Sequence, residues 1–341
     1  MTPTRHGRLP FLLLPLAALA LSGAAARAQP APNAEQRMRD MRDYREEMSK
    51  RALETARRRR FEEGKSDTAF PSDAEKAAAR PGVVRAASPA EQKALRHNER
   101  GLELFAKGKL EQAVKAYEEA IAAFPALAAA HNNLGSAHFA AGRFEQAAAS
   151  FQRAAELDPA YGQAHFNLAL AHIKLGRESE AHAALAAALR AYHSEGEAHL
   201  KAGRLREAEE SFRRMLQIDP DYAPAHLRLG LVCNAARRFD EAAEHLRRVV
   251  ASQPANPAAH EALAESLLGQ HKYEEAAASA DRALRHAPDS PAAHYLAGLA
   301  RASLGQRDAA LSHLARLQQL NSPDLAQHLS DFIDNKTPAK Q

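Results

Sequence analysis

The chain has 341 residues, of which 45% are hydrophobic and 26% are charged, and its formal net charge is +4. Three basic and no acidic residues precede residue 29, which leaves 43 basic and 42 acidic side chains in the rest. This interspersed near-balance argues against the basic face that nucleic-acid binding requires. The single cysteine, Cys233, excludes an internal disulfide.

Residues 1–28 have the pattern of a secretory signal peptide. Arg5 and Arg8 precede an apolar run at 11–21, and Ala26-Arg27-Ala28 offers the small residues that signal peptidase requires. The run is shorter than the about 20 apolar residues of a membrane span. We therefore predict cleavage near Ala28-Gln29, export to a Gram-negative periplasm, and no membrane span in the mature chain. The alternative is a signal that is retained as an anchor.

Two segments follow the signal. Residues 29–64 are highly charged, and Met38, Met41 and Met48 form only a sparse apolar stripe, which predicts a charged helical arm with weak self-association through 33–64. A solvated or partly disordered arm is the alternative. Residues 65–88, which contain Pro71 and Pro81-Gly82, have the composition of a flexible linker.

One short pattern then recurs seven times. It is clearest as GRFEQA, which begins at Gly142, and the other copies begin at Gly108, Gly176, Gly203, Arg237, His271 and Gly305. Within the repeat at 128–161, two helix-period segments are separated at Gly142 and closed by Asp158-Pro159. Glycine suits the left-handed residue that ends a helix, and proline prevents the next helix from continuing. The pattern predicts an array of helix pairs.

The repeat resembles the tetratricopeptide repeat (TPR). The resemblance is carried by Leu134-Gly135, Gly142, Ala147, Phe151, Ala154 and Pro159, and it returns in register over 94–322. It implies an all-α, right-handed α-solenoid of about seven antiparallel helix pairs over 89–322. Ser322-Pro323 predicts a capping helix over 323–334, followed by a tail at 335–341.

One interval is short. Five of the six intervals between successive copies are 34 residues, but Gly203 follows Gly176 by only 27. Seven residues make nearly two helical turns, so the shortening preserves the helix faces. Ser194 and Glu197 form a capping-box pattern, which predicts a stub helix at 195–202 after a helix ending near Tyr192. The stub predicts a notch that divides the array into 94–192 and 193–334, whereas a silent deletion would leave the array uniform.

The family resemblance also implies a binding groove. In TPR proteins the first helix of each pair builds a concave face that receives a peptide or a partner helix. Asn133 and Asn167 resemble the start of the asparagine ladder that holds peptide backbone in O-GlcNAc transferases. The residues that the resemblance places in the groove are Asn98, Phe105, Asn132, Asn133, Phe139, Phe166, Asn167, Leu170, Ile173, Leu200, Leu227, Leu231 and Tyr295.

No pattern of catalytic residues is evident. The sequence has no phosphate loop, no GxSxG and no HExxH, and six of its seventeen histidines occupy one equivalent repeat position, which favours a packing role. We therefore expect no catalytic residue, metal or cofactor. The sequence favours a non-enzymatic scaffold or adaptor in the cell envelope that binds a protein or peptide. The alternatives are a targeting or regulatory subunit of a separate enzyme or secretion machine, and a cell-wall or polysaccharide-export factor.

Overall fold

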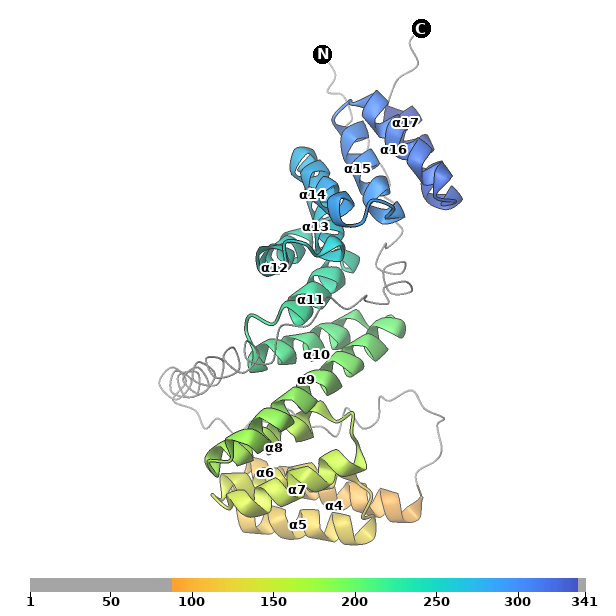
Figure 1. The fold of residues 1–341 in the computed structure, drawn as a ribbon. Helices are drawn as coiled ribbons and strands as arrows, with labels where there is room; N and C mark the ends of the chain where they lie inside the picture. The colour runs from red at the N-terminus through yellow and green to blue at the C-terminus, as the bar shows by residue number, and fades with distance from the viewer. Residues whose placement is uncertain (1–87, 337–341) are drawn as a thin grey trace, which may run out of the picture. The chain divides into compact units, whose positions relative to one another are not determined.

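A computed structural model describes residues 88–336 of the chain (Figure 1). The predicted signal peptide, the charged arm, the linker up to residue 87 and the tail from 337 lie outside the described residues. Within 88–336 the chain forms fourteen α-helices, α4 to α17, and no strand. The prediction of an all-α repeat solenoid is confirmed.

The helices divide into two compact units. Among the described residues, the N-terminal unit contains 88–204 together with 217–219, and the C-terminal unit contains 205–216 and 220–336. The boundary follows Arg204, in the turn between the helices that end at Lys201 and begin at Leu205, and not residue 192.

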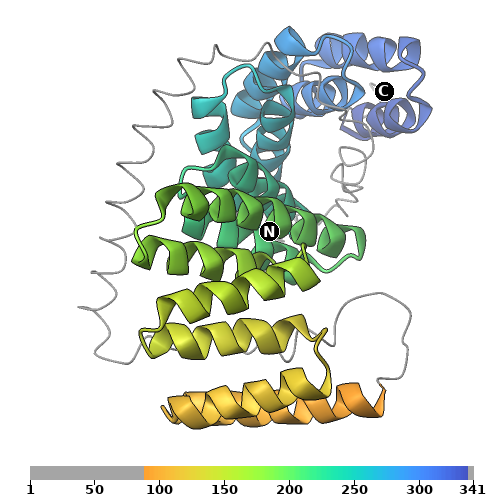
Figure 2. The same cartoon turned by 60° about the horizontal axis from the view of Figure 1, so that its bottom comes forward.

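The N-terminal unit is a stack of antiparallel helices (Figure 2). Each helix packs against the next along the chain, from α4 to α9. Ser88 caps the first helix through a capping box with Glu91. The helices are α4 (Pro89–Ala106), α5 (Leu110–Ala123), α6 (Ala128–Ala140), α7 (Phe144–Leu157), α8 (Gly162–Lys174) and α9 (Glu178–Lys201).

A small residue on one helix allows an aromatic ring on its partner to enter the core. At Gly135 a Cβ atom would lie 2.6 Å from the Cδ1 atom of Phe151, which is fully buried. Gly101 faces Tyr117 and Gly162 faces Tyr192 in the same way. Because real Cβ atoms do not approach other atoms so closely, a larger residue at these glycines would force the helix pair apart.

The C-terminal unit repeats this plan. Helices α11 to α16 pack in sequence, and α17 covers α15 and α16 with Leu329 and Ile333 buried, so it closes the stack. Its helices are α10 (Leu205–Ile218), α11 (Ala223–Ala235), α12 (Phe239–Ser252), α13 (Pro257–Gly269), α14 (Tyr273–His286), α15 (Pro291–Ser303), α16 (Arg307–Gln319) and α17 (Pro323–Lys336).

The turn within each helix pair contains a left-handed residue. Glycine occupies it five times, with φ between 69° and 75°, as predicted for Gly142. In two pairs of the C-terminal unit Arg237 and His271 take this conformation instead, with φ of 60° and 62°. Side chains at such angles are strained.

The predicted stub helix is wrong. Helix α9 runs unbroken from Glu178 to Lys201, through His193 and Ser194. The shortened interval removes the proline turn itself, and the residues that remain are alanine-rich and contain no proline to stop the helix. A capping box stabilises a helix start only where the chain leaves the helix, and here the backbone N–H groups are already bonded within α9. The notch stays a prediction.

None of the described helices is both long enough and apolar enough to cross a membrane.

Candidate functional site

The first helices of successive pairs contact one another in each unit. In the N-terminal unit these are α4, α6 and α8, and in the C-terminal unit they are α11, α13 and α15. The second helices of successive described pairs make at most marginal contact. Since the first helices lie closer together, they form the inner face of each stack.

The repeat register arranges side chains of this inner face in three rows, each running across three first helices. In the N-terminal unit the first row is Asn98, Asn132 and Phe166, the second is Leu102, Ser136 and Leu170, and the third is Phe105, Phe139 and Ile173. In the C-terminal unit the first row is Leu227, Glu261 and Tyr295, the second is Leu231, Glu265 and Leu299, and the third is Asn234, Leu268 and Ala302.

The predicted asparagines are buried and bond to one another across helices. Asn133 Nδ2 donates to Asn98 Oδ1, and Asn167 Nδ2 donates to Asn132 Oδ1, both at 2.9 Å. Gln163 Nε2 donates to Asn167 Oδ1 at 2.8 Å. All four asparagines are at most 7% exposed. These amides therefore link α4 to α6 and α6 to α8.

The apolar residues of the same unit are more open. Phe105 and Phe139 are half-buried against neighbouring core clusters, and the ring of Phe139 stands edge-on to Phe144 with centroids 5.2 Å apart. Phe166 and Leu170 are half-buried on α8. One turn further on, Ile173 is 41% exposed, the highest value for a large hydrophobic side chain among the described residues. We call the set Phe105, Phe139, Phe166, Leu170 and Ile173 the apolar strip.

The remaining predicted groove residues lie on α9 and in the C-terminal unit. Leu200 is half-buried near the end of α9. Leu227 and Leu231 are half-buried against the core of the C-terminal unit. Tyr295 is buried, and its hydroxyl lies 2.8 Å from His328 Nδ1.

Two carboxylates lie in the middle of the first two rows of the C-terminal unit. Glu265 is 7% exposed, and burial raises its pKa to about 7 even though Asn234 Nδ2 donates to it at 3.4 Å. Burial also raises the pKa of Glu261, which accepts a hydrogen bond from Ser290 Oγ. Glu261 is not among the predicted groove residues, although the repeat register alone aligns it with Leu227.

The recurring histidines bind the turns between pairs. The Nε2 atoms of His131, His165, His226, His260 and His294 each lie 2.9–3.1 Å from the carbonyl oxygen of a proline six residues earlier. A carbonyl only accepts, so Nε2 carries the proton and Nδ1 is an acceptor. His226 Nδ1 lies 2.8 Å from His245 Nδ1, and His294 Nδ1 lies 3.0 Å from His313 Nδ1. When both rings are neutral the second histidine of each pair is the donor, and burial lowers the pKa of that second histidine in both pairs.

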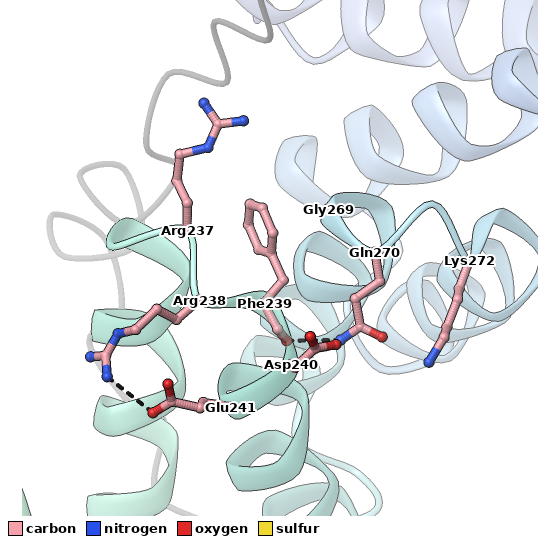
Figure 3. A pocket seen from close by; sticks show the side chains of 8 residues that line it. All are labelled: Arg237, Arg238, Phe239, Asp240, Glu241, Gly269, Gln270 and Lys272. Atoms are coloured by element: carbon pink, nitrogen blue, oxygen red, sulfur yellow. Dashed lines mark hydrogen bonds and ion pairs between the residues drawn. The ribbon is translucent and has the colours of Figure 1, made fainter.

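A further cluster lies at the start of α12. Ligand atoms of Glu209, Cys233 and Glu241 lie within 4.8 Å of one another. Arg238 bonds both glutamates, and burial raises the pKa of the Cys233 thiol to about 11. Metal ions bind thiolates, not thiols, so this geometry is that of an ion-pair network. Beside it lies a hollow of about 470 Å³ in which Gln270 Nε2 donates to the Phe239 carbonyl (Figure 3).

Two family models, both described as Tetratricopeptide repeat, match the chain. One covers residues 138–202 and 199–265, and the other covers 98–162 and 261–324. The chain belongs to the tetratricopeptide repeat family. No curated protein matches its sequence.

Many solved structures are similar to parts of this TPR protein. A tetratricopeptide repeat protein from Parabacteroides merdae ATCC 43184 is 17% identical, with 71% of this chain and 99% of that chain covered and a TM-score of 0.37. YrrB, described as a TPR protein with an unusual peptide-binding site, is 17% identical over 59% of this chain and 89% of its own, with a TM-score of 0.29. The second TPR of Spaghetti (RPAP3), bound to an HSP90 peptide, is 30% identical over 29% of this chain and 92% of its own, with a TM-score of 0.29.

Proposed function

We propose that this TPR protein is a non-enzymatic scaffold that binds a segment of another protein on the inner face of its N-terminal unit. The observation that carries the proposal is the apolar strip. Its members come from three different helices, and it ends in Ile173, which is 41% exposed. Partly exposed apolar side chains that gather on neighbouring helices favour a protein-binding surface.

The test compares two exposed hydrophobic positions. Ile173→Glu places a charge at the open end of the apolar strip, whereas Leu311→Glu makes the same change on α16, a second helix, where Leu311 is 38% exposed. Both variants should keep the wild-type helicity because neither side chain is buried. Phe139 is a poorer choice because it packs against the core.

The mature wild-type chain and both variants would be used side by side to capture proteins from an envelope extract. We expect the Ile173→Glu chain to lose specific proteins that the wild-type and Leu311→Glu chains retain, with binding about tenfold weaker or more once a partner is purified. Equal capture by all three chains would contradict the proposal.

We also propose that the scaffold works in the cell envelope. The support is the signal-like pattern of residues 1–28, with its basic start, apolar run and Ala26-Arg27-Ala28 site. Amino-terminal sequencing of the protein from native envelope should find Gln29 first. An intact Met1 in a purely cytosolic pool would overturn this proposal.

A further inference from the structure

The inner face of the C-terminal unit differs from the apolar strip in having carboxylates between apolar residues. Glu261 lies between Leu227 of α11 and Tyr295 of α15 in the first row, and Glu265 lies between Leu231 and Leu299 in the second. The helices α11, α13 and α15 contact in that order, so equivalent positions on them are neighbours. The two glutamates are four residues apart and therefore share one face of α13.

Among the described residues, neither carboxylate has a lysine, arginine or histidine partner within ion-pair distance. Their neutral partners are Ser290 Oγ for Glu261 and Asn234 Nδ2 for Glu265. The surrounding residues Leu268, Tyr295 and Leu299 belong to the hydrophobic core of the unit. A buried carboxylate without a counter-ion is unfavourable, and a cation brought to it would remove most of that penalty.

Glu265 also affects the pKa of a tyrosine on the neighbouring helix α15. Burial, and then the charge of Glu265, raise the pKa of Tyr295 on α15 to about 12. The carboxylate of Glu265 is thus close enough to affect a side chain across the row.

The apolar surroundings decide what kind of cation fits. Calcium and magnesium prefer six or more oxygen ligands, several of them from water, and the leucine and tyrosine neighbours offer few. Lysine and arginine have long apolar stems with a charge at the tip, so their stems suit the leucines while the tip reaches the carboxylates.

We propose that the inner face of the C-terminal unit binds a protein segment that presents a lysine or arginine side chain between apolar residues, and that Glu261 and Glu265 accept this cation. The inference rests on the proposed function, because it assumes that the chain binds protein segments. It adds to that function a second contact, in which an acidic pair accepts a basic side chain. The apolar strip takes apolar side chains, and this acidic pair selects for a basic one.

The test uses random peptides displayed on phage, selected against the mature chain and against three variants. Glu261→Gln combined with Glu265→Gln removes both charges while keeping the side-chain shapes. Glu274→Gln makes a like change at an exposed position on α14 and serves as the control. Ile173→Glu tests the apolar strip. Circular dichroism would check that all four chains are folded.

We expect the wild-type and Glu274→Gln chains to enrich peptides with a lysine or arginine flanked by apolar residues, and the double variant to lose this enrichment. A synthesised peptide should bind the double variant at least about tenfold more weakly, and replacing its basic residue with norleucine should weaken wild-type binding to a similar degree. Enrichment without basic residues, or enrichment that the double variant keeps, would overturn the inference. If those peptides still need Ile173, the proposed function stands. If no peptide is enriched, both fail.

Discussion

The two units of this TPR protein use the same repeat positions for different purposes. In the N-terminal unit the inner first row begins with Asn98 and Asn132, whose amides link successive helices. In the C-terminal unit the equivalent positions are Leu227 and Glu261, and the polar groups there are carboxylates without a cation. A repeat fixes where a side chain lies, but the residue at that place decides whether neighbouring helices are linked through paired amides or through a carboxylate that accepts from a serine or an asparagine.

The largest expected difference between the two units is in which of them a core substitution destabilises. The residues to change are the equivalent core residues of the two units. Phe151 faces Gly135 in one unit, and Leu246 faces Gly230 in the other, and both side chains are fully buried. Phe151→Ala should lower the free energy of unfolding by about 3–5 kcal/mol and Leu246→Ala by about 2–5 kcal/mol.

Hydrogen exchange would locate each effect, with the reactivity of Cys233 as a second probe of the C-terminal unit, since this lone thiol is 1% exposed. We expect Phe151→Ala to loosen α4 to α8 while Cys233 stays protected, and Leu246→Ala to expose Cys233. Equal loosening of both units by either change would show that they unfold as one.

The second test concerns α9, which ends next to the boundary between the units. Proline is favoured in the first turn of a helix, so Glu195→Pro would be harmless if a helix began there. In the middle of α9 it removes a hydrogen bond and should cost about 3 kcal/mol or more. Urea unfolding of Glu195→Pro measures this, with Glu195→Ala as the control for the weak Glu195–His199 contact at 3.9 Å. A proline variant as stable as the alanine variant would mean that a separate helix begins at Glu195, as the sequence predicted.

A fall in pH should next destabilise the C-terminal unit through its buried histidines. Burial lowers the pKa values of His245 and His313 from 6.5 to about 4. The unfolded chain therefore takes up these protons first, and stability is lost as the pH falls from about 6.5 to 4, by on the order of 3 kcal/mol per histidine. Glu265 acts oppositely: its raised pKa of about 7 means that stability is gained as the pH falls from about 7 to 4.5, by a similar amount. The net result is a loss in the C-terminal unit.

Urea unfolding at pH 7 and pH 4.5, followed by circular dichroism, would measure this loss. His245→Asn with His313→Asn should reduce it, because an Asn amide can still donate to the histidine partner without titrating. Glu265→Gln should deepen it. In the N-terminal unit burial also lowers the pKa values of His138 and His172, so a loss there has the same sign. An unchanged stability in the wild type would contradict the two His–His pairs.

The smallest of these effects should come from the asparagine links. Asn132→Ala leaves the buried Asn167 Nδ2 group without its acceptor and should cost about 1–3 kcal/mol. The double variant Asn132→Ala with Asn167→Ala should cost less than the sum of the single changes, because the two amides form one interaction. Additive losses would mean that the asparagines contribute separately.

The sequence predicted most of the fold because its signals are local and repeated. Gly142, Pro159 and the spacing of 34 residues specify helix ends wherever they recur, and the described helices follow them. The prediction failed at Ser194, where a local capping pattern is overridden by a helix that never stops. The site was harder to predict because burial is not local. Asn98 bonds Asn133 and Asn132 bonds Asn167 across helices, and the pKa of Glu265 is raised only by burial in the folded unit.

The two left-handed turn residues have a consequence for engineering a sturdier version of this protein. Arg237 and His271 adopt an angle that the other repeats reserve for glycine. Arg237→Gly and His271→Gly should each raise the free energy of unfolding by up to about 1 kcal/mol, which is the strain relieved less the greater chain entropy of glycine. A designer who averages these repeats into a consensus would begin with these two turns.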